Sequence, residues 1–234
     1  MIIYVVGYGR AGSTALTEAL EEKLNAVNLG EVKYLYRTDK DDLLAPYWIS
    51  FKQRNADLLR TSSFGFMKYD SITGFFLRGK NRERKYCEKW DEIFSRMGLN
   101  PQEDIIIDSS KTPLDSFMRG IYLKKCFQEV LFIKPKRPFI DTIRSLLKGK
   151  NSNIERGERK SLLGRIIHTM FIGLPHLLIT NLLTRIYLFY GLETIDLKNM
   201  ETSLDKFFDR HNLQRRESSK ALPMIYGNRS RLNK

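Results

Sequence analysis

A glycine-rich turn near the amino end constrains the fold of this chain more than any other feature. It follows Ile2–Val6, a short apolar run typical of a strand that is buried on both faces of a parallel sheet. The turn reads GYGRAGST over residues 7–14. Apolar residues then recur at helical spacing, at Ala15, Leu16, Ala19, Leu20 and Leu24. Strand, glycine-rich turn and helix in this order predict a βα unit of the kind that binds phosphate at the helix amino end.

Further short apolar runs predict more strands of the same sheet. These runs are Ala26–Leu29, Ile105–Ile107, Val130–Ile133 and Thr194–Leu197. Helical patterns lie between or after them, over Trp90–Met97, from about Pro113, after Pro138 to about Leu147, over 162–190 and over Leu204–His211. Strands that alternate with helices predict an α/β fold, with one domain over 1–234 built on a parallel sheet flanked by helices.

Charged residues follow the carboxyl ends of the predicted strands. Arg10, Lys111 and Arg137 each follow one strand, and Glu31 follows another. Ligands of open α/β sheets bind beyond the carboxyl ends of the strands. Three cations and one carboxylate at these positions therefore predict an anion site.

The charge balance agrees with an anionic ligand but does not identify it. The 234 residues include 40 Lys and Arg against 27 Asp and Glu, a formal net charge of +13. Such a chain attracts nucleic acid, an anionic membrane or a polyanionic small molecule. Its 42% of hydrophobic residues exclude a largely disordered chain.

Two cysteines, Cys87 and Cys126, are too few for a disulfide framework, which predicts a reducing, cytoplasmic setting.

Three segments bear on membranes and on surface loops. The amino end has no basic region and no small-residue cleavage site, so it does not resemble a secretory signal. The most apolar window, Ile166–Thr184, is long enough to span a membrane, but Pro175, Asn181 and two histidines interrupt it. These interruptions favour a buried or amphipathic helix. Thr61–Lys85 combines Ser, Gly and Phe with a basic cluster and is predicted to be a surface excursion, such as a lid.

The first loop suits an anion but departs from the loop of nucleotide-hydrolysing proteins. Glycines let successive backbone N–H groups face a ligand, and the following helix adds the positive end of its dipole. A nucleotide-hydrolysing P-loop has lysine after its second glycine, whereas Ser13 stands there and Arg10 is the only cation of the loop. The letters of a dinucleotide fingerprint also match, with Glu31 as the acidic residue at the expected distance. A glycine turn without a ligand is the third alternative.

Residues 7–14 resemble the 5′-phosphosulfate loop of sulfotransferases that use 3′-phosphoadenosine 5′-phosphosulfate (PAPS). The usual pattern is a basic residue followed by Ser-Gly-Thr/Ser-Thr, and Ala11 stands in the place of the first serine. The resemblance implies the sulfotransferase variant of the P-loop nucleotide hydrolase-like fold, with Arg10 at the sulfate or 5′-phosphate. It also implies that the cradle is completed by Gly9, Ala11, Gly12, Ser13 and Thr14.

A later segment resembles the 3′-phosphate motif of the same family. Arg137 precedes Ser145 by eight residues, which is the spacing between the strand-end arginine and the helical serine of that motif. Lys134 and Thr142 form an alternative register with the same spacing. The resemblance implies that one of these pairs, with Arg137 and Ser145 preferred, holds the 3′-phosphate.

Two more segments extend the resemblance over nearly the whole chain. Ile105–Lys111 resembles the Asp-Ser-Ser-Lys segment of bacterial members, in which Asp108 is expected to cap the next helix or to orient Lys111. Residues 227–231 (GNRSR) resemble their Gly-Asn-x-x-Arg segment, which adds Arg229 to the implied PAPS contacts.

The implied chemistry is sulfuryl transfer, which like phosphoryl transfer depends mainly on positioning and charge stabilisation. Glu31 follows Gly30, a context similar to that of the catalytic glutamate of several sulfotransferases, and is predicted to be the general base. Lys111 and Arg10 are predicted to stabilise charge on the donor. The alternatives are an ion-paired or surface glutamate and a solvated lysine. No metal is expected, because the phosphate leaving group is already a good one.

The implied acceptor is a hydroxyl of a glycan, a glycolipid or a small molecule. Nucleic acid is not an expected partner, whereas the basic surface permits peripheral membrane contact. Three alternatives stay open at this point: a P-loop kinase or nucleoside triphosphatase, a basic protein that binds nucleic acid or membrane, and an inactive member of the sulfotransferase family.

Overall fold

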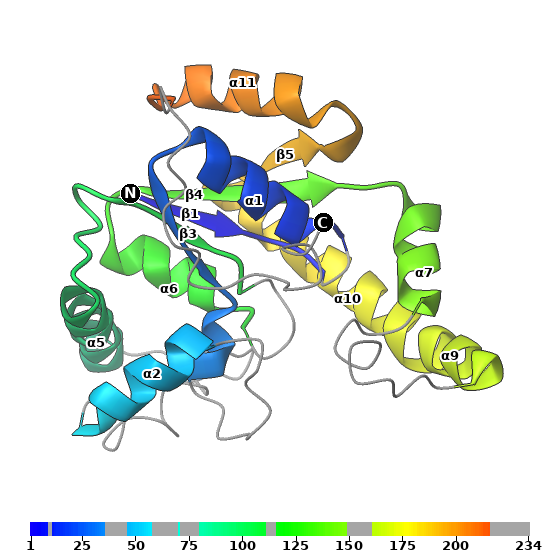
Figure 1. Ribbon diagram of the computed structural model, residues 1–234, viewed down its shortest axis with the longest axis horizontal. Helices are drawn as coiled ribbons and strands as arrows, with labels where there is room; N and C mark the ends of the chain where they lie inside the picture. The colour runs from blue at the N-terminus through cyan, green and yellow to red at the C-terminus, as the bar shows by residue number, and fades with distance from the viewer. Residues whose placement is uncertain are drawn as a thin grey trace.

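Five parallel strands form the centre of the computed structural model, which describes residues 1–8, 11–35, 46–57, 70, 80–110, 116–148 and 161–215. The strands are β1 (Ile2–Val5), β2 (Ala26–Gly30), β3 (Ile105–Asp108), β4 (Val130–Lys136) and β5 (Glu193–Asp196). Their order in the sheet is β2-β3-β1-β4-β5, so β1 is the central strand (Figure 1). All neighbouring strands pair in parallel. The predicted α/β fold with a parallel sheet is confirmed, and each predicted run overlaps a strand.

Successive side chains of β1 belong to two separate cores. Ile2 and Tyr4 pack in one hydrophobic cluster, and Ile3 and Val5 pack in the other. All four are almost completely buried. Because helices cover both faces of a parallel sheet, its strands carry apolar residues at consecutive positions, and this explains the unbroken apolar run in the sequence.

Helices α1 (Ser13–Lys23) and α11 (Met200–Arg210) cover the face of Ile3 and Val5 (Figure 1). Leu16 and Leu20 of α1 pack there, as the helical spacing predicted. Helix α11 begins four residues before the predicted start at Leu204, because three polar residues, 201–203, separate Met200, which also packs against the core, from the next apolar position.

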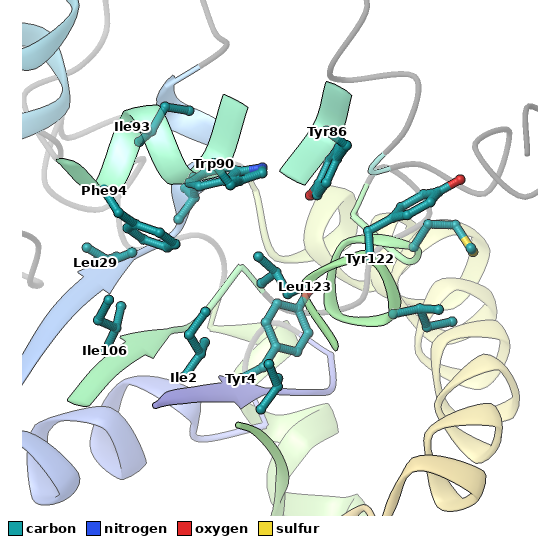
Figure 2. Packing of buried hydrophobic residues seen from close by; sticks show 14 of the residues in the cluster. Ile2, Tyr4, Leu29, Tyr86, Trp90, Ile93, Phe94, Ile106, Tyr122 and Leu123 are labelled. Carbon is teal, nitrogen blue, oxygen red and sulfur yellow. The ribbon is translucent and has the colours of Figure 1, made fainter. Parts of the chain in front are cut away.

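Helices α2 (Pro46–Arg54), α5 (Lys80–Arg96) and α6 (Arg119–Cys126) contribute to the cluster on the opposite face. Tyr86, Trp90 and Phe94 of α5 lie over the sheet residues Ile2 and Ile106 (Figure 2). The predicted surface excursion is therefore wrong for residues 80–85, which form the first turns of α5. Lys, Arg and Glu are good helix formers, so this basic stretch extends the helix without apolar residues of its own. The rest of that segment, apart from Asp70, lies outside the described residues.

Cys87 of α5 and Cys126 of α6 form a disulfide, with their Cα atoms 5.0 Å apart. The cysteine count predicted a reducing compartment, but packing of α5 against α6 brings these two residues, 39 positions apart in the sequence, together in a single disulfide. Disulfides persist in oxidising compartments, so the cysteine content no longer supports a reducing setting. The cytoplasmic setting stays a prediction.

The segment Leu162–Tyr190 is one continuous helical rod. It consists of α9 (Leu162–His168), a π-helical turn η4 (Thr169–Gly173), α10 (Leu174–Thr184) and a 3₁₀ turn η5 (Arg185–Tyr190). It is long and apolar enough to cross a membrane by length and composition, yet only 22% of its most apolar window is buried inside the protein. The predicted helix is confirmed. Of the two expected alternatives, a buried or an amphipathic helix, the low burial disagrees with the buried one.

Candidate functional site

The strand ends β1 and β3 form a topological switch point of the sheet. The two strands are neighbours, yet the helix that follows β1, α1, covers one face, and the helix that comes after β3, α6, covers the other. In open α/β sheets ligands bind beyond the carboxyl ends of such strands. Glu31 directly follows β2, and Arg137 directly follows β4. These two predicted site residues and the first loop therefore lie along the same edge of the sheet.

The first loop leads into α1 through two glycines with positive φ. Gly7 has a φ of 137° and Gly12 a φ of 97°, values that favour glycine strongly. Between them Ala11 N donates to the carbonyl of Tyr8 at 3.1 Å. Gly12 is the N-cap of α1, which has no side-chain cap and no acidic residue in its first turn. Among the described residues no side chain caps its first N–H groups, which together with the positive end of its dipole suit an anion.

The predicted cradle residues take different positions around this helix start. Ser13 is buried, and Thr14 is half-buried in the first turn, where its carbonyl accepts from Thr17 Oγ1 at 3.0 Å. Gly12 lies against Leu197 of the 3₁₀ turn η6 (Leu197–Asn199) so closely that a Cβ at this position would overlap Leu197 Cδ1. Glycine at position 12 thus serves both the backbone conformation and the packing of the loop.

Two backbone contacts with the end of β3 hold the chain on both sides of Glu31. The carbonyl of Gly30 accepts from Ser109 N at 3.0 Å. Val32 N donates to Ser110 Oγ, also at 3.0 Å. Glu31 itself is only 9% exposed. The predicted base is therefore mostly buried, and both of its neighbours are fixed to the strand beside the switch point.

A buried ionic network lies directly behind Ser110. Asp108 Oδ1 accepts from Ser110 N at 2.8 Å. The next described helix, α6, has Met118 as its N-cap, so the prediction that Asp108 caps it is wrong. Asp108 Oδ2 is 2.7 Å from both Nε and Nη2 of Arg119. Arg119 also lies 3.6 Å from Asp70 Oδ2, with its guanidinium 3.9 Å above the ring of Trp90. All of these side chains are buried, so the network is a rigid base for the β3 end.

Sequence reasoning did not find Arg119 or Asp70, since neither belongs to a motif or follows a strand. Burial raises the pKa of Asp70 to about 6, against the lowering effects of Arg119 and of the Tyr86 hydroxyl, which donates to it at 2.6 Å. The one available signal was weak: Arg119 directly precedes the apolar residues of α6, and an arginine that is buried requires acidic partners.

The two registers of the 3′-phosphate motif lie in different surroundings. Lys134 lies within β4, where its Nζ donates to Asn181 Oδ1 at 3.0 Å and Thr184 Oγ1 at 3.2 Å of α10. Burial, followed by the charge of Arg185, lowers the pKa of Lys134. Arg137 and Ser145 are both half-buried, with Arg137 beyond the strand end and Ser145 in α7 (Phe139–Leu147). The preference for Arg137 and Ser145 stays a prediction.

Four predicted site residues, Gly9, Arg10, Lys111 and Arg229, lie outside the described residues. His176 of α10, which is not a predicted site residue, packs edge-on against Tyr8 of the first loop, with ring centroids 5.3 Å apart. Within the described part of the chain, no group of three His, Cys, Asp or Glu side chains is placed to hold a metal ion.

A hollow of about 330 Å³ lies between β5 and α11. Its lining residues are Leu192, Glu193, Thr194, Ile195, Ser203, Lys206, Phe207 and Arg210. It contains none of the predicted site residues.

Comparisons with known proteins do not assign the chain to a family. No protein-family model matches the chain, and no curated protein matches it.

Proposed function

We propose that the protein transfers a sulfuryl group from PAPS to a hydroxyl acceptor. The observation that carries the proposal is the amino end of α1, which follows the central strand, has Gly12 as its N-cap and has no acidic residue in its first turn. A helix start of this kind binds phosphate or sulfate through backbone N–H groups. Ser13 stands where a nucleotide-hydrolysing loop needs lysine, so the same loop favours PAPS over magnesium–ATP.

The surroundings of this helix start fit the two ends of such a donor. Glu31 is separated from the central strand by β3, which corresponds to about 10 Å across two strand spacings. Arg137 and Ser145 follow β4 on the other side of the central strand. An anion at α1 therefore has a carboxylate on one flank and a basic strand end on the other. We assign the 3′-phosphate to the basic flank and the acceptor hydroxyl to the flank of Glu31.

The proposed reaction needs little covalent chemistry from the protein. The acceptor oxygen forms a bond to sulfur, the bond between sulfur and the bridging oxygen breaks, and adenosine 3′,5′-bisphosphate leaves. Glu31 takes the proton of the acceptor hydroxyl. Lys111 and Arg10 neutralise charge on the bridging and peripheral oxygens. The hydrogen bonds of Ser109 with Gly30 and of Ser110 with Val32 hold the segment of Glu31 in place. Positioning of the base against the acceptor hydroxyl then supplies a large share of the catalysis.

Ligand binding tests the proposal directly. Adenosine 3′,5′-bisphosphate without magnesium is expected to raise the melting temperature of the wild type, and magnesium–ATP is expected to raise it less. Arg10→Ala is expected to lose most of the bisphosphate shift, whereas Arg84→Ala, on the exposed surface of α5, is the matched control. A shift with magnesium–ATP and none with the bisphosphate would favour a kinase or triphosphatase instead.

Transfer of labelled sulfate from PAPS to a panel of glycan, glycolipid and small hydroxyl acceptors tests the reaction itself. Glu31→Gln is expected to lower turnover about 100-fold or more while leaving bisphosphate binding intact, which is the usual effect of losing a general base. Glu22→Gln, an exposed position of α1, is the control. Full turnover by Glu31→Gln would remove this residue as the base, and bisphosphate binding without any transfer would indicate an inactive family member.

A further inference from the structure

The helical rod Leu162–Tyr190 has the polarity of its faces reversed relative to a helix of a water-soluble protein. The residues that it buries against the protein are mostly small, four of six being threonine or glycine, at a spacing of three or four: Thr169, Gly173, Leu177, Thr180, Thr184 and Tyr187. The residues that it exposes are large and apolar, with Phe171 75% exposed and Phe189 90% exposed. Small residues toward the protein and large apolar residues outward are the arrangement of a helix that faces lipid.

The exposed apolar residues follow the length of the rod and continue onto α7, which lies beside the first half of the rod. Of the described residues, every large hydrophobic side chain that is exposed belongs to this rod or to α7, where Phe139 and Ile140 are 50% and 62% exposed. Helix α7 contacts both α9 and η4, and the three lie together at the end of the molecule away from α5 (Figure 1). We call these exposed side chains of α7 and the rod the apolar face. Contiguous exposed apolar surface of this kind marks an interaction site.

The charges around the apolar face are mostly positive. From Arg159 to Leu192 the sequence contains no Asp or Glu, while Arg165 and Arg185 lie within the rod. Arg144 and Lys148 are exposed cations at the end of α7, and Asp141 of the same helix, 3.5 Å from Arg144, offsets one of them. Anionic lipid headgroups attract such cations, whereas a second copy of the same basic face would be repelled by them. Charge complementarity therefore favours an anionic lipid bilayer as the partner.

Hydrogen bonds and core packing hold the inner face of the rod against the rest of the protein. These contacts limit how the rod can bind a bilayer. Tyr187 is buried in the main core, and its hydroxyl donates to the carbonyl of Phe117 at 2.6 Å. Lys134 of β4 donates to both Asn181 and Thr184. A rod that crossed the bilayer would have to give up these contacts, whereas a rod that lies in the interface keeps them.

We propose that the apolar face docks the protein on an anionic lipid bilayer, with the rod lying in the interface rather than spanning it. The proposal is independent of the sulfuryl-transfer chemistry. Since His176 of the same rod packs against Tyr8 of the first loop, docking would also bring the candidate site close to the bilayer surface.

Flotation with lipid vesicles tests the docking on the full chain. The wild type is expected to float with vesicles of phosphatidylcholine and phosphatidylserine and much less with pure phosphatidylcholine. The double variant Phe171→Ser/Phe189→Ser is expected to lower vesicle binding roughly tenfold or more, because each phenyl side chain buries a large apolar area. Both residues are exposed, so circular dichroism should show an unchanged fold.

Arg185→Gln is expected to weaken vesicle binding about fivefold. Lys85→Gln, exposed on α5 at the opposite end, is the charge-matched control and should bind as the wild type does.

Four results of these experiments would overturn the docking proposal. Folded protein that fails to float with anionic vesicles would exclude docking. Vesicle binding that is abolished by high salt but unchanged in Phe171→Ser/Phe189→Ser would show that the protein binds the vesicles through its charges alone. A stable dimer that this double variant dissociates, without vesicle binding, would assign the apolar face to a second copy. Resistance to extraction by alkaline carbonate would indicate a spanning helix instead of a docked one.

Discussion

Arg119 and Asp108 form a buried ion pair behind the candidate site, in which Nε and Nη2 of Arg119 both lie 2.7 Å from Asp108 Oδ2. The pair links the body of the protein to the end of β3, because the other oxygen of Asp108 accepts from Ser110 N and Ser110 Oγ accepts from Val32 N. Arg119 thus positions the segment of Glu31 through two intervening residues. The stability of the fold and the geometry of the site depend on the same contacts.

Arg119→Met is expected to destabilise the protein by about 3–5 kcal/mol, because it leaves Asp108 and Asp70 buried without their cation. Chemical denaturation of the variant and the wild type measures this difference. Arg84→Met is the control, since Arg84 pairs with Glu88 on the exposed surface of α5 and should change the free energy of unfolding by less than about 0.5 kcal/mol. Equal stabilities of the two variants would contradict a central role for the buried pair.

Asp70 is expected to make the protein less stable as the pH rises from about 4 to about 6. Its pKa is raised from 3.8 to about 6 in the folded state, so the folded protein binds a proton more tightly than the unfolded chain does. The favourable contribution is complete below the unfolded pKa and is lost as the pH passes the folded pKa. The full effect of this residue is about 3 kcal/mol at most.

Asp70→Asn tests this pH dependence while keeping an oxygen that can accept from Tyr86. The difference in unfolding free energy between wild type and variant should change between pH 4 and pH 6.5 and be constant above pH 7. Denaturation curves measured at half-unit steps of pH give this difference. A difference that is the same at every pH would mean that Asp70 does not titrate in this range.

The disulfide between Cys87 and Cys126 closes a loop of 39 residues and joins α5 to α6. Cys87→Ser is expected to lower the free energy of unfolding by about 2–4 kcal/mol, mainly because the unfolded chain regains freedom. Denaturation with and without reductant measures the effect. Reductant should destabilise the wild type to the level of the variant and leave the variant unchanged. A wild type that reductant does not affect would contradict this contribution of the disulfide.

The strands and the first loop were predictable because their signals are local. A strand buried on both faces has an unbroken apolar run, as in Ile105–Ile107, and a turn with positive φ has glycine, as at Gly12. The sheet edge that collects Glu31 and Arg137 follows from the general behaviour of parallel sheets.

The rest of the site depends on contacts between distant parts of the chain. Arg119 meets Asp70 across 49 positions of the sequence, and no periodicity encodes such a pair. The rod Leu162–Tyr190 was predicted as a helix from its composition, but composition does not say which face packs inward. Only the packing showed that its threonines are buried and its phenylalanines exposed.

Ser110→Ala is expected to lower turnover in the sulfate-transfer assay more than it lowers the affinity for adenosine 3′,5′-bisphosphate. The change leaves Val32 N without its 3.0 Å acceptor and frees the segment of Glu31, which the proposed reaction needs in a fixed position. Ser109→Ala is the matched control, because Ser109 holds Gly30 through its backbone N–H, which the substitution keeps. Equal turnover of the two variants would show that the Ser110 hydroxyl does not position the site.

Gly12→Ala tests the first loop and separates its backbone strain from its role in binding. A side chain at a φ of 97° is expected to cost about 1–2 kcal/mol, and its Cβ would also displace Leu197 and shift the start of α1. We therefore expect a loss of stability together with a loss of bisphosphate affinity of roughly tenfold or more, equivalent to about 1.4 kcal/mol. Gly98→Ala is the matched control: Gly98 has a φ of 70° with open space around it, so it carries the same kind of backbone strain away from the loop. Calorimetric titration and thermal denaturation of both variants measure the two effects separately. If both variants lose stability but bind the bisphosphate as tightly as the wild type, the amino end of α1 does not hold the anion.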